Sequence, residues 1–167
     1  MRETWKPIDD FPAYSYSVSS FGQVRSEKTG RAMAQFQNQS GYVYVSLTSA
    51  QGNQVSVSVS LLVARAFLDP DPRRLFTTPI NLNGYRRDNF VGNLMWRPKW
   101  FAMRYHRQFL LPPTGLLRPV YDVVTGEVYE TSFDAAVRYG LLDQDIKKAY
   151  RNDDYVWPTK LKFRPVE

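Results

Sequence analysis

Few side chains in this sequence could act as a general base near neutral pH. His106 is the only histidine among 167 residues, and the chain contains no cysteine. General-base chemistry needs a group that titrates near pH 7, which leaves His106 as the one conventional candidate. The lack of cysteine excludes a disulfide scaffold and a cysteine-ligated zinc finger, and it is compatible with a reducing cytosol.

Basic side chains are a second group of candidate functional residues, because they can bind anions. The chain has 22 Lys and Arg against 16 Asp and Glu, a formal net charge of +6. Such an excess favours polyanionic partners, because cations neutralise phosphates and release counterions, although a soluble basic protein without such a partner can have the same charge. Trp100 and Tyr105 lie among some of these cations, which suits stacking. The candidate contacts are Arg73, Arg74, Arg86, Arg87, Arg97, Lys99, Arg104, Arg107, Gln144, Lys147, Lys148 and Arg151.

No segment has the composition of a signal peptide or a membrane span. The charged opening is not followed by an apolar region, and the longest apolar run, 59–68, is interrupted by Ser60 and Arg65. A spanning helix needs about 20 apolar residues. We therefore expect a cytoplasmic protein without a membrane partner.

Alternation of apolar and polar residues predicts short antiparallel strands near the start of the chain. The turn Gln51-Gly52-Asn53 between two alternating runs is typical of a half-buried hairpin. Ser60 is then expected to cap a helix that ends before Asp69. The strand candidates are residues 14–18, 24–26, 41–47 and 54–59.

The middle of the chain is expected to be rich in loops. Residues 69–79 contain many Pro and Arg, Asn83-Gly84 marks a turn, and 93–96 is a candidate short strand. A helix is predicted over 98–110, because Pro suits the first helical position. Residues 111–117 have the composition of a linker. The helix residues expected in the core are Trp100, Phe101 and Phe109.

The last module is predicted to combine a hairpin with two short helices. The hairpin turns at Thr125-Gly126, and the first helix covers 133–139, ended by Gly140 in the left-handed conformation. Asp143 can cap a second helix that runs to about Arg151. Two short helices joined through a Gly-containing turn are typical of a helix-turn-helix, although a helical hairpin covering a small sheet has the same pattern. One side of the second helix carries Gln144, Lys147, Lys148 and Arg151.

Several of these stretches resemble the HNH homing endonucleases of phages and introns. The opening is similar to the N-terminal modular motif of that family, and three later stretches are similar to its strand, helix and N-x-x-x-N-L-x-W motifs. The C-terminal stretch resembles the helix-turn-helix repeat of intron-encoded members. The matching residues are Trp5-Lys6-Pro7-Ile8 with Tyr16 to Ser26, Gly41 to Leu47, Leu62 to Leu68, Asn89 with Asn93-Leu94-Met95-Trp96, and Pro119 to Ala149.

The resemblance implies a ββα-metal centre that cuts or nicks DNA. In the family a histidine acts as general base, and an acidic or amide residue and an Asn hold one divalent metal. Alignment on Gly84 places Ile80 at the metal-binding position, Asn81 at the base, and Asn83 at a following Asp. Asn does not accept a proton at a useful pH, and Ile offers no oxygen to a hard cation.

Two residues of the expected centre are left in this sequence. Asn93 is a metal-ligand candidate, and His106 is close to where a third element of the centre could lie. As simpler alternatives, Asn93 supports a turn and His106 occupies a helix face. We therefore expect no cleavage and no cofactor, whereas Mg²⁺ would be required by a nuclease.

The expected fold is α+β, with small antiparallel hairpins, short helices, a degenerate HNH-like ββα-metal centre and a C-terminal hairpin plus helix-turn-helix module. The segments are a β-rich motif over 1–58, a degenerate HNH-like region over 59–110, the linker 111–117, and a DNA-binding module over 118–167.

Three functions are compatible with these features. The first is a phage-encoded protein that binds double-stranded DNA without cutting it, in the cytoplasm of the host cell. The second is an active site-specific nickase rebuilt around Asn93 and His106, which the Ile80-Asn81 pair disfavours. The third is an adaptor or inhibitor whose old DNA surface binds a host or virion protein, because fold does not fix function.

Overall fold

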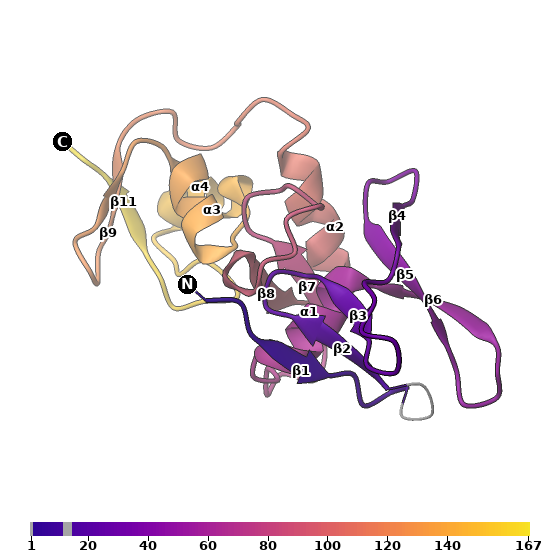
Figure 1. Cartoon of the computed structure of the whole chain (residues 1–167). Helices are drawn as coiled ribbons and strands as arrows, with labels where there is room; N and C mark the ends of the chain where they lie inside the picture. Colours follow the sequence, from indigo (N-terminus) through magenta and orange to yellow (C-terminus); the bar gives the residue numbers. More distant parts are fainter. Residues whose placement is uncertain (1, 12–14) are drawn as a thin grey trace. The chain divides into compact units, whose positions relative to one another are not determined.

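The computed structural model describes residues 2–11 and 15–167 (Figure 1). The chain divides into two compact units. The N-terminal unit contains Met1–Asn81 and Tyr85–Lys99, and the C-terminal unit contains Leu82–Gly84 and Trp100–Glu167. No helix within the described residues is long and apolar enough to cross a membrane.

The N-terminal unit consists of two three-stranded antiparallel sheets, a two-stranded hairpin and one helix. The sheets have the strand orders β1-β2-β3 and β4-β5-β6, and β7 pairs with β8. The 3₁₀ turn η1 precedes β8. The elements are β1 (Trp5–Pro7), β2 (Tyr16–Ser19), β3 (Val24–Ser26), β4 (Gln35–Gln37), β5 (Val43–Thr48), β6 (Gln54–Ser58), α1 (Val59–Phe67), β7 (Thr78–Asn81), η1 (Val91–Asn93) and β8 (Leu94–Arg97).

Helix α1 is the centre of the core of this unit, because it contacts both sheets and the β7–β8 hairpin. Leu62 and Val63 of α1 are buried in one cluster with Val18 of β2 and with Val45 and Leu47 of β5. Each such side chain contributes about 1.5–3 kcal/mol through burial. The alternation along β5 places one face of its sheet in this core and leaves the other face outside.

Two predicted boundaries in this unit are wrong. Ser60 does not cap α1, because the helix begins at Val59 directly after β6, with Ser58 at the N-cap and no side-chain cap hydrogen bond. The Ser60 hydroxyl instead pairs with that of Ser58 at 2.9 Å. Strand β7 starts at Thr78, inside the expected loop 69–79. Tyr14, at the start of the first strand candidate, lies outside the described residues.

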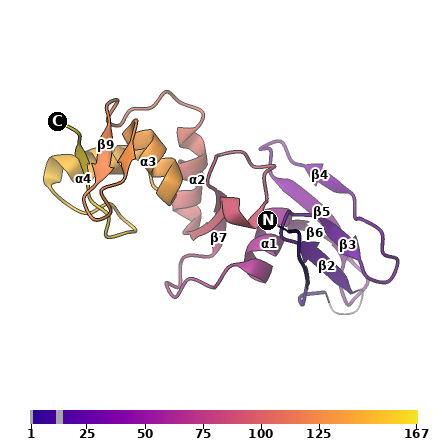
Figure 2. The same ribbon diagram turned by 60° about the vertical axis from the view of Figure 1, so that its left-hand side comes forward.

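The C-terminal unit combines helix α2 with a three-stranded antiparallel sheet and two short helices (Figure 2). The sheet has the strand order β10-β9-β11, so the last strand of the chain pairs with the first strand of the sheet. The elements are α2 (Lys99–Gln108), β9 (Val120–Asp122), β10 (Val128–Tyr129), α3 (Ser132–Tyr139), α4 (Asp143–Asn152) and β11 (Phe163–Pro165).

The ends of α3 and α4 follow from local chemistry. Thr131 caps α3 through a capping box with Asp134, and Gly140 ends the helix in the left-handed conformation, at φ 62°. The N-cap of α4 is Leu142 and not Asp143, whose carboxylate is bonded elsewhere. The expected α+β class, with small antiparallel sheets and short helices, is confirmed.

Gly84 and Gly126 allow a matched test of the turn beside α2. Both have φ near +74° (74° and 73°), but a Cβ at Gly84 would meet the Phe109 ring at 2.4 Å, whereas nothing lies within 4 Å at Gly126. Gly126→Ala should cost about 1 kcal/mol from the left-handed backbone alone. Gly84→Ala should cost about 1–3 kcal/mol more through overpacking. Urea unfolding measures both, and equal losses would contradict the Phe109 contact.

Candidate functional site

The positions aligned with the nuclease centre form a hydrogen-bonded structure around one backbone carbonyl. The side-chain nitrogens of Asn81 and Asn93 both donate to the carbonyl oxygen of Asp88, each at 2.8 Å. Asn81 also approaches the Asn89 side-chain oxygen at 3.3 Å. Asn81 is 1% exposed and Asn93 8% exposed. Both amides therefore hold the chain between β7 and β8 in place, as interior polar groups must be satisfied.

The residues at these positions do not fit a divalent cation. Ile80 is fully buried and pairs with Met95 across the hairpin, so the metal-binding position presents only hydrocarbon. Mg²⁺ is usually bound through one or two carboxylates, and neither Ile80 nor Asn81 supplies one. Asn83 lies exposed in the turn after β7. Within the described residues, no group of three or more His, Asp or Glu side chains could hold a metal ion.

His106 lies in the C-terminal unit, on the last turns of α2. Its ring is 2% exposed and packs edge-on against Tyr105, with ring centroids 6.0 Å apart. Tyr105 is fully buried and donates its hydroxyl to the carbonyl of Leu82 at 2.6 Å. The surroundings of His106 are therefore those of a packed helix face. Of the aromatic residues expected in the core, Phe101 is fully buried, whereas Trp100 is 49% exposed and that prediction is wrong.

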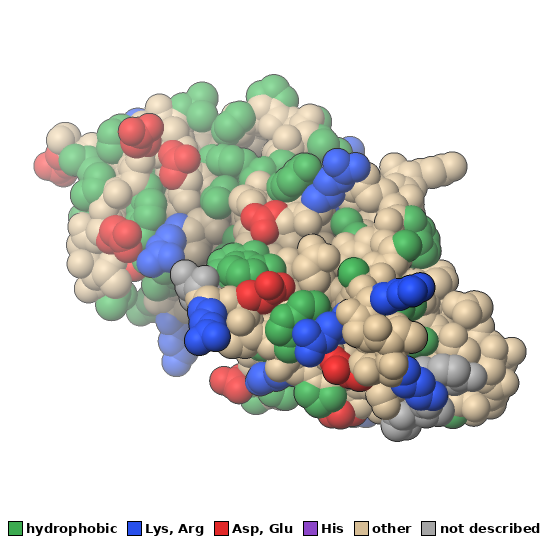
Figure 3. Space-filling view, viewed as in Figure 1, with side chains coloured by type: hydrophobic (Ala, Val, Ile, Leu, Met, Phe, Trp, Pro, Cys, Tyr) green, Lys and Arg blue, Asp and Glu red, His purple; other side chains and the backbone are tan. Residues whose placement is uncertain are grey.

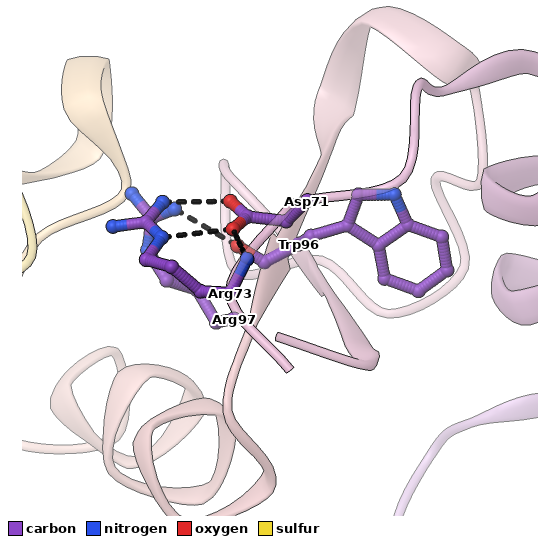
Figure 4. Close-up of polar contacts among 4 residues, drawn as sticks. All are labelled: Asp71, Arg73, Trp96 and Arg97. Atoms are coloured by element: carbon purple, nitrogen blue, oxygen red, sulfur yellow. Dashed lines mark hydrogen bonds and ion pairs between the residues drawn. The ribbon is translucent and has the colours of Figure 1, made fainter. Parts of the chain in front are cut away.

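Arg73 is bound by a carboxylate of its own unit (Figure 4). Its Nε and terminal nitrogen reach the two oxygens of Asp71 at 2.8 and 2.6 Å, and its guanidinium lies over the Phe76 ring at 3.7 Å. The hydrogen bonds from Arg73 lower the pKa of the Asp71 carboxyl, and Arg97 contributes less. Arg97 is 4% exposed and donates to the Trp96 carbonyl at 2.9 Å. Of these three predicted contacts, Arg74 is the one that is exposed and makes no ion pair with the residues that the structure describes.

Two further arginines lie against the sheet β4–β5–β6. The guanidinium of Arg86 lies over the Tyr42 ring at 4.3 Å and donates to the Ser40 carbonyl. Arg87 donates to the side chain of Gln37 on β4. The structure therefore places both cations of this predicted pair next to the same sheet.

The outer face of that sheet is a partly exposed polar surface that the sequence analysis did not identify. Period-two alternation puts the hydroxyl and amide side chains on the face opposite Val45 and Leu47. Phe36 and Tyr44 stack there with centroids 6.0 Å apart. The polar positions of this hairpin are hydroxyl and amide residues without charge, and this feature of the sequence could have indicated the surface. The face consists of Phe36, Tyr44, Ser46, Thr48, Gln54, Ser56 and Ser58.

In the C-terminal unit, the predicted contacts line two adjoining hollows along α4. The first has a volume of about 320 Å³ and is lined by Arg104 and Arg107. The second, of about 480 Å³, is lined by Lys147, Lys148 and Arg151. Thr114 and Gln144 line both hollows, which we call the α4 groove.

Some cations of the α4 groove are bound within the chain and others are not. Arg104 forms an ion pair with Asp145 at 3.7 Å, and Lys147 donates to the Thr114 carbonyl at 2.7 Å. Arg107, Lys148 and Arg151 are exposed and make no ion pair or side-chain hydrogen bond with the described residues, and neither does Lys99. On the face shown in Figure 3, basic side chains are dispersed among acidic and apolar ones.

The shared Asp88 carbonyl should make Asn81 and Asn93 energetically coupled. Asn81→Ala and Asn93→Ala should each lower the free energy of unfolding by about 1 kcal/mol, because in each single variant the other amide still donates to the Asp88 carbonyl. The double variant should cost about 1 kcal/mol more than the sum, since the carbonyl then loses both donors. Urea unfolding measures the cycle, with Asn53→Ala in an exposed turn as control. Simple additivity would contradict the shared acceptor.

The Asp71–Arg73 pair should have a defined pH signature. Because the folded-state pKa of Asp71 is lowered, its contribution to stability is present above the unfolded pKa near 3.9 and is lost as pH falls through the folded value. Asp71→Asn should be less stable by about 0–1 kcal/mol at pH 7, and the difference should vanish once the pH has fallen through the folded-state pKa of Asp71. The control is Asp69→Asn, because Asp69 is an exposed carboxylate that makes no ion pair with the described part of the chain. A difference that persists in acid would exclude this pair as its cause.

Comparisons with known proteins agree with this fold. The NUMOD4 motif matches residues 3–48. An HNH endonuclease of Acanthamoeba polyphaga mimivirus is 32% identical in an alignment 99 residues long, which covers 56% of this chain and 23% of that protein. The matched region is therefore less than a quarter of that relative. The solved structure of the HNH homing endonuclease I-HmuI, which binds and cleaves DNA, is similar over 98% of both chains, with a TM-score of 0.54 and 20% identity.

The expected resemblance is therefore confirmed at the level of relationship and fold. The motif and the mimivirus protein match through sequence, and I-HmuI matches through the arrangement of the backbone. This chain carries a NUMOD4 motif, is similar in sequence to part of an HNH endonuclease, and has the fold of an HNH homing endonuclease.

Proposed function

We propose that this protein binds double-stranded DNA and does not cleave it. The observation that carries the proposal is the α4 groove, where Arg107, Lys148 and Arg151 are exposed and have no carboxylate partner within the described chain. Cations held near one another without internal partners favour a polyanion, because each phosphate contact releases condensed counterions.

The position of the groove on α4 supports a duplex as the polyanion. Helix α4 follows α3 after a short turn at Gly140, and its exposed side carries Gln144 and Lys148. A second helix presented in this way can enter a major groove while flanking cations contact phosphates. Relationship to HNH homing endonucleases, among which I-HmuI binds DNA, gives independent support.

The outer face of the sheet β4–β5–β6 is proposed as a second DNA contact. Its hydroxyl and amide groups can form hydrogen bonds with base edges and sugars. Strands can also enter a DNA groove. Arg86 lies over the Tyr42 ring at the end of this face and can contact phosphates, whereas Arg87 is bonded to Gln37, whose side chain points to the other face.

The lack of cleavage follows from the chemistry at Ile80 and Asn81. Hydrolysis of a phosphodiester needs a base for the attacking water and a charge to stabilise the transition state. Asn81 instead donates to the Asp88 carbonyl, and buried Ile80 has no ligand atom. These observations disfavour a nickase rebuilt around Asn93 and His106. The similarity to a mimivirus protein supports the proposal that a phage or another virus encodes this chain.

A protein-binding adaptor is the second candidate. Trp100 and Trp157 are 49% and 45% exposed and stack with centroids 5.2 Å apart, and Met103 on α2 is 67% exposed. Exposed aromatic residues of this kind are typical of protein interfaces. This candidate predicts little affinity for duplex DNA.

A salt titration with matched variants tests the proposal. We would measure fluorescence anisotropy of a labelled mixed-sequence duplex with Lys148→Ala/Arg151→Ala and with Arg118→Ala/Arg138→Ala. Both doubles remove two exposed cations that have no partner among residues 2–11 and 15–167, but only the first pair lines the α4 groove. The groove variant should reduce the log–log salt slope by about 2, and the control should leave it nearly unchanged.

Three results would contradict the proposal in different ways. Equal slopes for both doubles would remove the α4 groove from the interface. Negligible binding of the unaltered protein at ~50 mM salt would favour the adaptor, because nonspecific affinity is mainly electrostatic. A nicked or cut strand on a denaturing gel, formed only with Mg²⁺, would show that the protein is a nuclease.

A further inference from the structure

Thr114 is bound to the first turns of α4 through all three of its polar groups. Its amide donates to the Asp143 carboxylate at 3.1 Å, and its hydroxyl accepts from the Gln144 side chain at 3.0 Å. Its carbonyl accepts from the Lys147 ammonium at 2.7 Å. One residue outside the helix therefore holds three side chains that follow one another along α4.

The position of Thr114 is fixed by its neighbour. The amide of Gly115 donates to the same Asp143 oxygen at 2.7 Å, and Gly115 is buried. A Cβ at Gly115 would lie 1.8 Å from the Asp143 carboxylate, so no other residue fits there without displacement. Asp143 itself is 3% exposed and also accepts from the Ser132 hydroxyl. Thr114 is thus held in place by hydrogen bonds within the lining of the α4 groove.

The hydrogen bonds to Thr114 leave recognition groups available. A glutamine amide has two N–H donors and one acceptor oxygen, and a lysine ammonium has three donors. Gln144 uses one donor on the Thr114 hydroxyl and makes no other side-chain hydrogen bond within the described residues. Its oxygen and second N–H can still pair with a base edge, as Gln does with adenine. Lys147 likewise retains two donors.

We infer that Thr114 is a positioning residue, which orients Gln144 and Lys147 for sequence-specific recognition of DNA. The inference rests on the proposed DNA-binding function and adds to it the residue that organises base contact. Ordering a long side chain at an interface costs about 0.5–1.5 kcal/mol, and a side chain already held in place avoids that cost. Sequence discrimination should therefore depend on the Thr114 hydroxyl, although that hydroxyl need not touch DNA.

The test compares Thr114→Val with Thr114→Ser. Valine removes the hydroxyl and leaves both backbone hydrogen bonds, whereas serine keeps the hydroxyl. The probes are a duplex enriched from a random library by the unaltered protein and a mixed-sequence duplex. Thr114→Val should weaken binding to the enriched duplex by about 2- to 12-fold, with less than 2-fold change on the mixed duplex and an unchanged salt slope. Thr114→Ser should bind as the unaltered protein does.

A second measurement uses the free protein. The ¹⁵N order parameter of the Gln144 side-chain amide should be high in the unaltered protein and in Thr114→Ser, and it should fall in Thr114→Val. An unchanged order parameter would overturn the inference, as would equal weakening on both duplexes. Tighter binding by Thr114→Val would show that Thr114 masks the groove. Failure to enrich any sequence would also overturn the inference, whereas salt-dependent binding would leave the proposed function intact. Absence of all DNA binding would remove both.

Discussion

Burial of the Asp143 carboxylate takes a charge out of water, and such a group is tolerated only when hydrogen bonds satisfy its oxygens. Backbone amides of Thr114 and Gly115 and the hydroxyl of Ser132 supply those bonds. Because Ser132 begins α3 and Asp143 begins α4, one carboxylate joins the starts of both helices to the segment that precedes β9. The geometry of the α4 groove depends on this contact.

The fold was predictable wherever a local pattern determined it. Alternation identified the hairpin that became β5 and β6, and Gly140 marked the end of α3. The role of Asp143 was not predictable, because it is decided by groups distant in sequence. The Ser60 prediction failed for a local reason, because α1 begins at Val59 directly after β6. Asp143 could have capped α4, but its donors lie 28 and 29 residues earlier, at Gly115 and Thr114. A sequence pattern does not show which donors a carboxylate will bind when local and distant donors compete for it.

The candidate site shows the same division between local and distant effects. Alignment of one glycine was enough to place Ile80 and Asn81 at the positions of the nuclease centre. It could not reveal that Asn81 and Asn93 meet at the carbonyl of Asp88. The sequence analysis ranked Arg97 and Arg151 equally as candidate contacts, whereas burial and internal partners separate them in the structure. Which cations face solvent is a property of packing, and no spacing rule specifies it.

The uncharged character of the sheet β4–β5–β6 has a consequence for the behaviour of the protein in concentrated solution. Its two edge strands, β4 and β6, contain no Lys, Arg, Asp, Glu or Pro, and Gln54 to Ser56 are exposed. Natural proteins usually block exposed edges with charge or proline, because unpaired backbone groups recruit strands from other molecules. On β4 the neighbouring Arg87 opposes such pairing, and on β6 the shortness of the strand, five residues, opposes it. We expect lateral self-association through β6 to limit solubility when no partner covers the sheet.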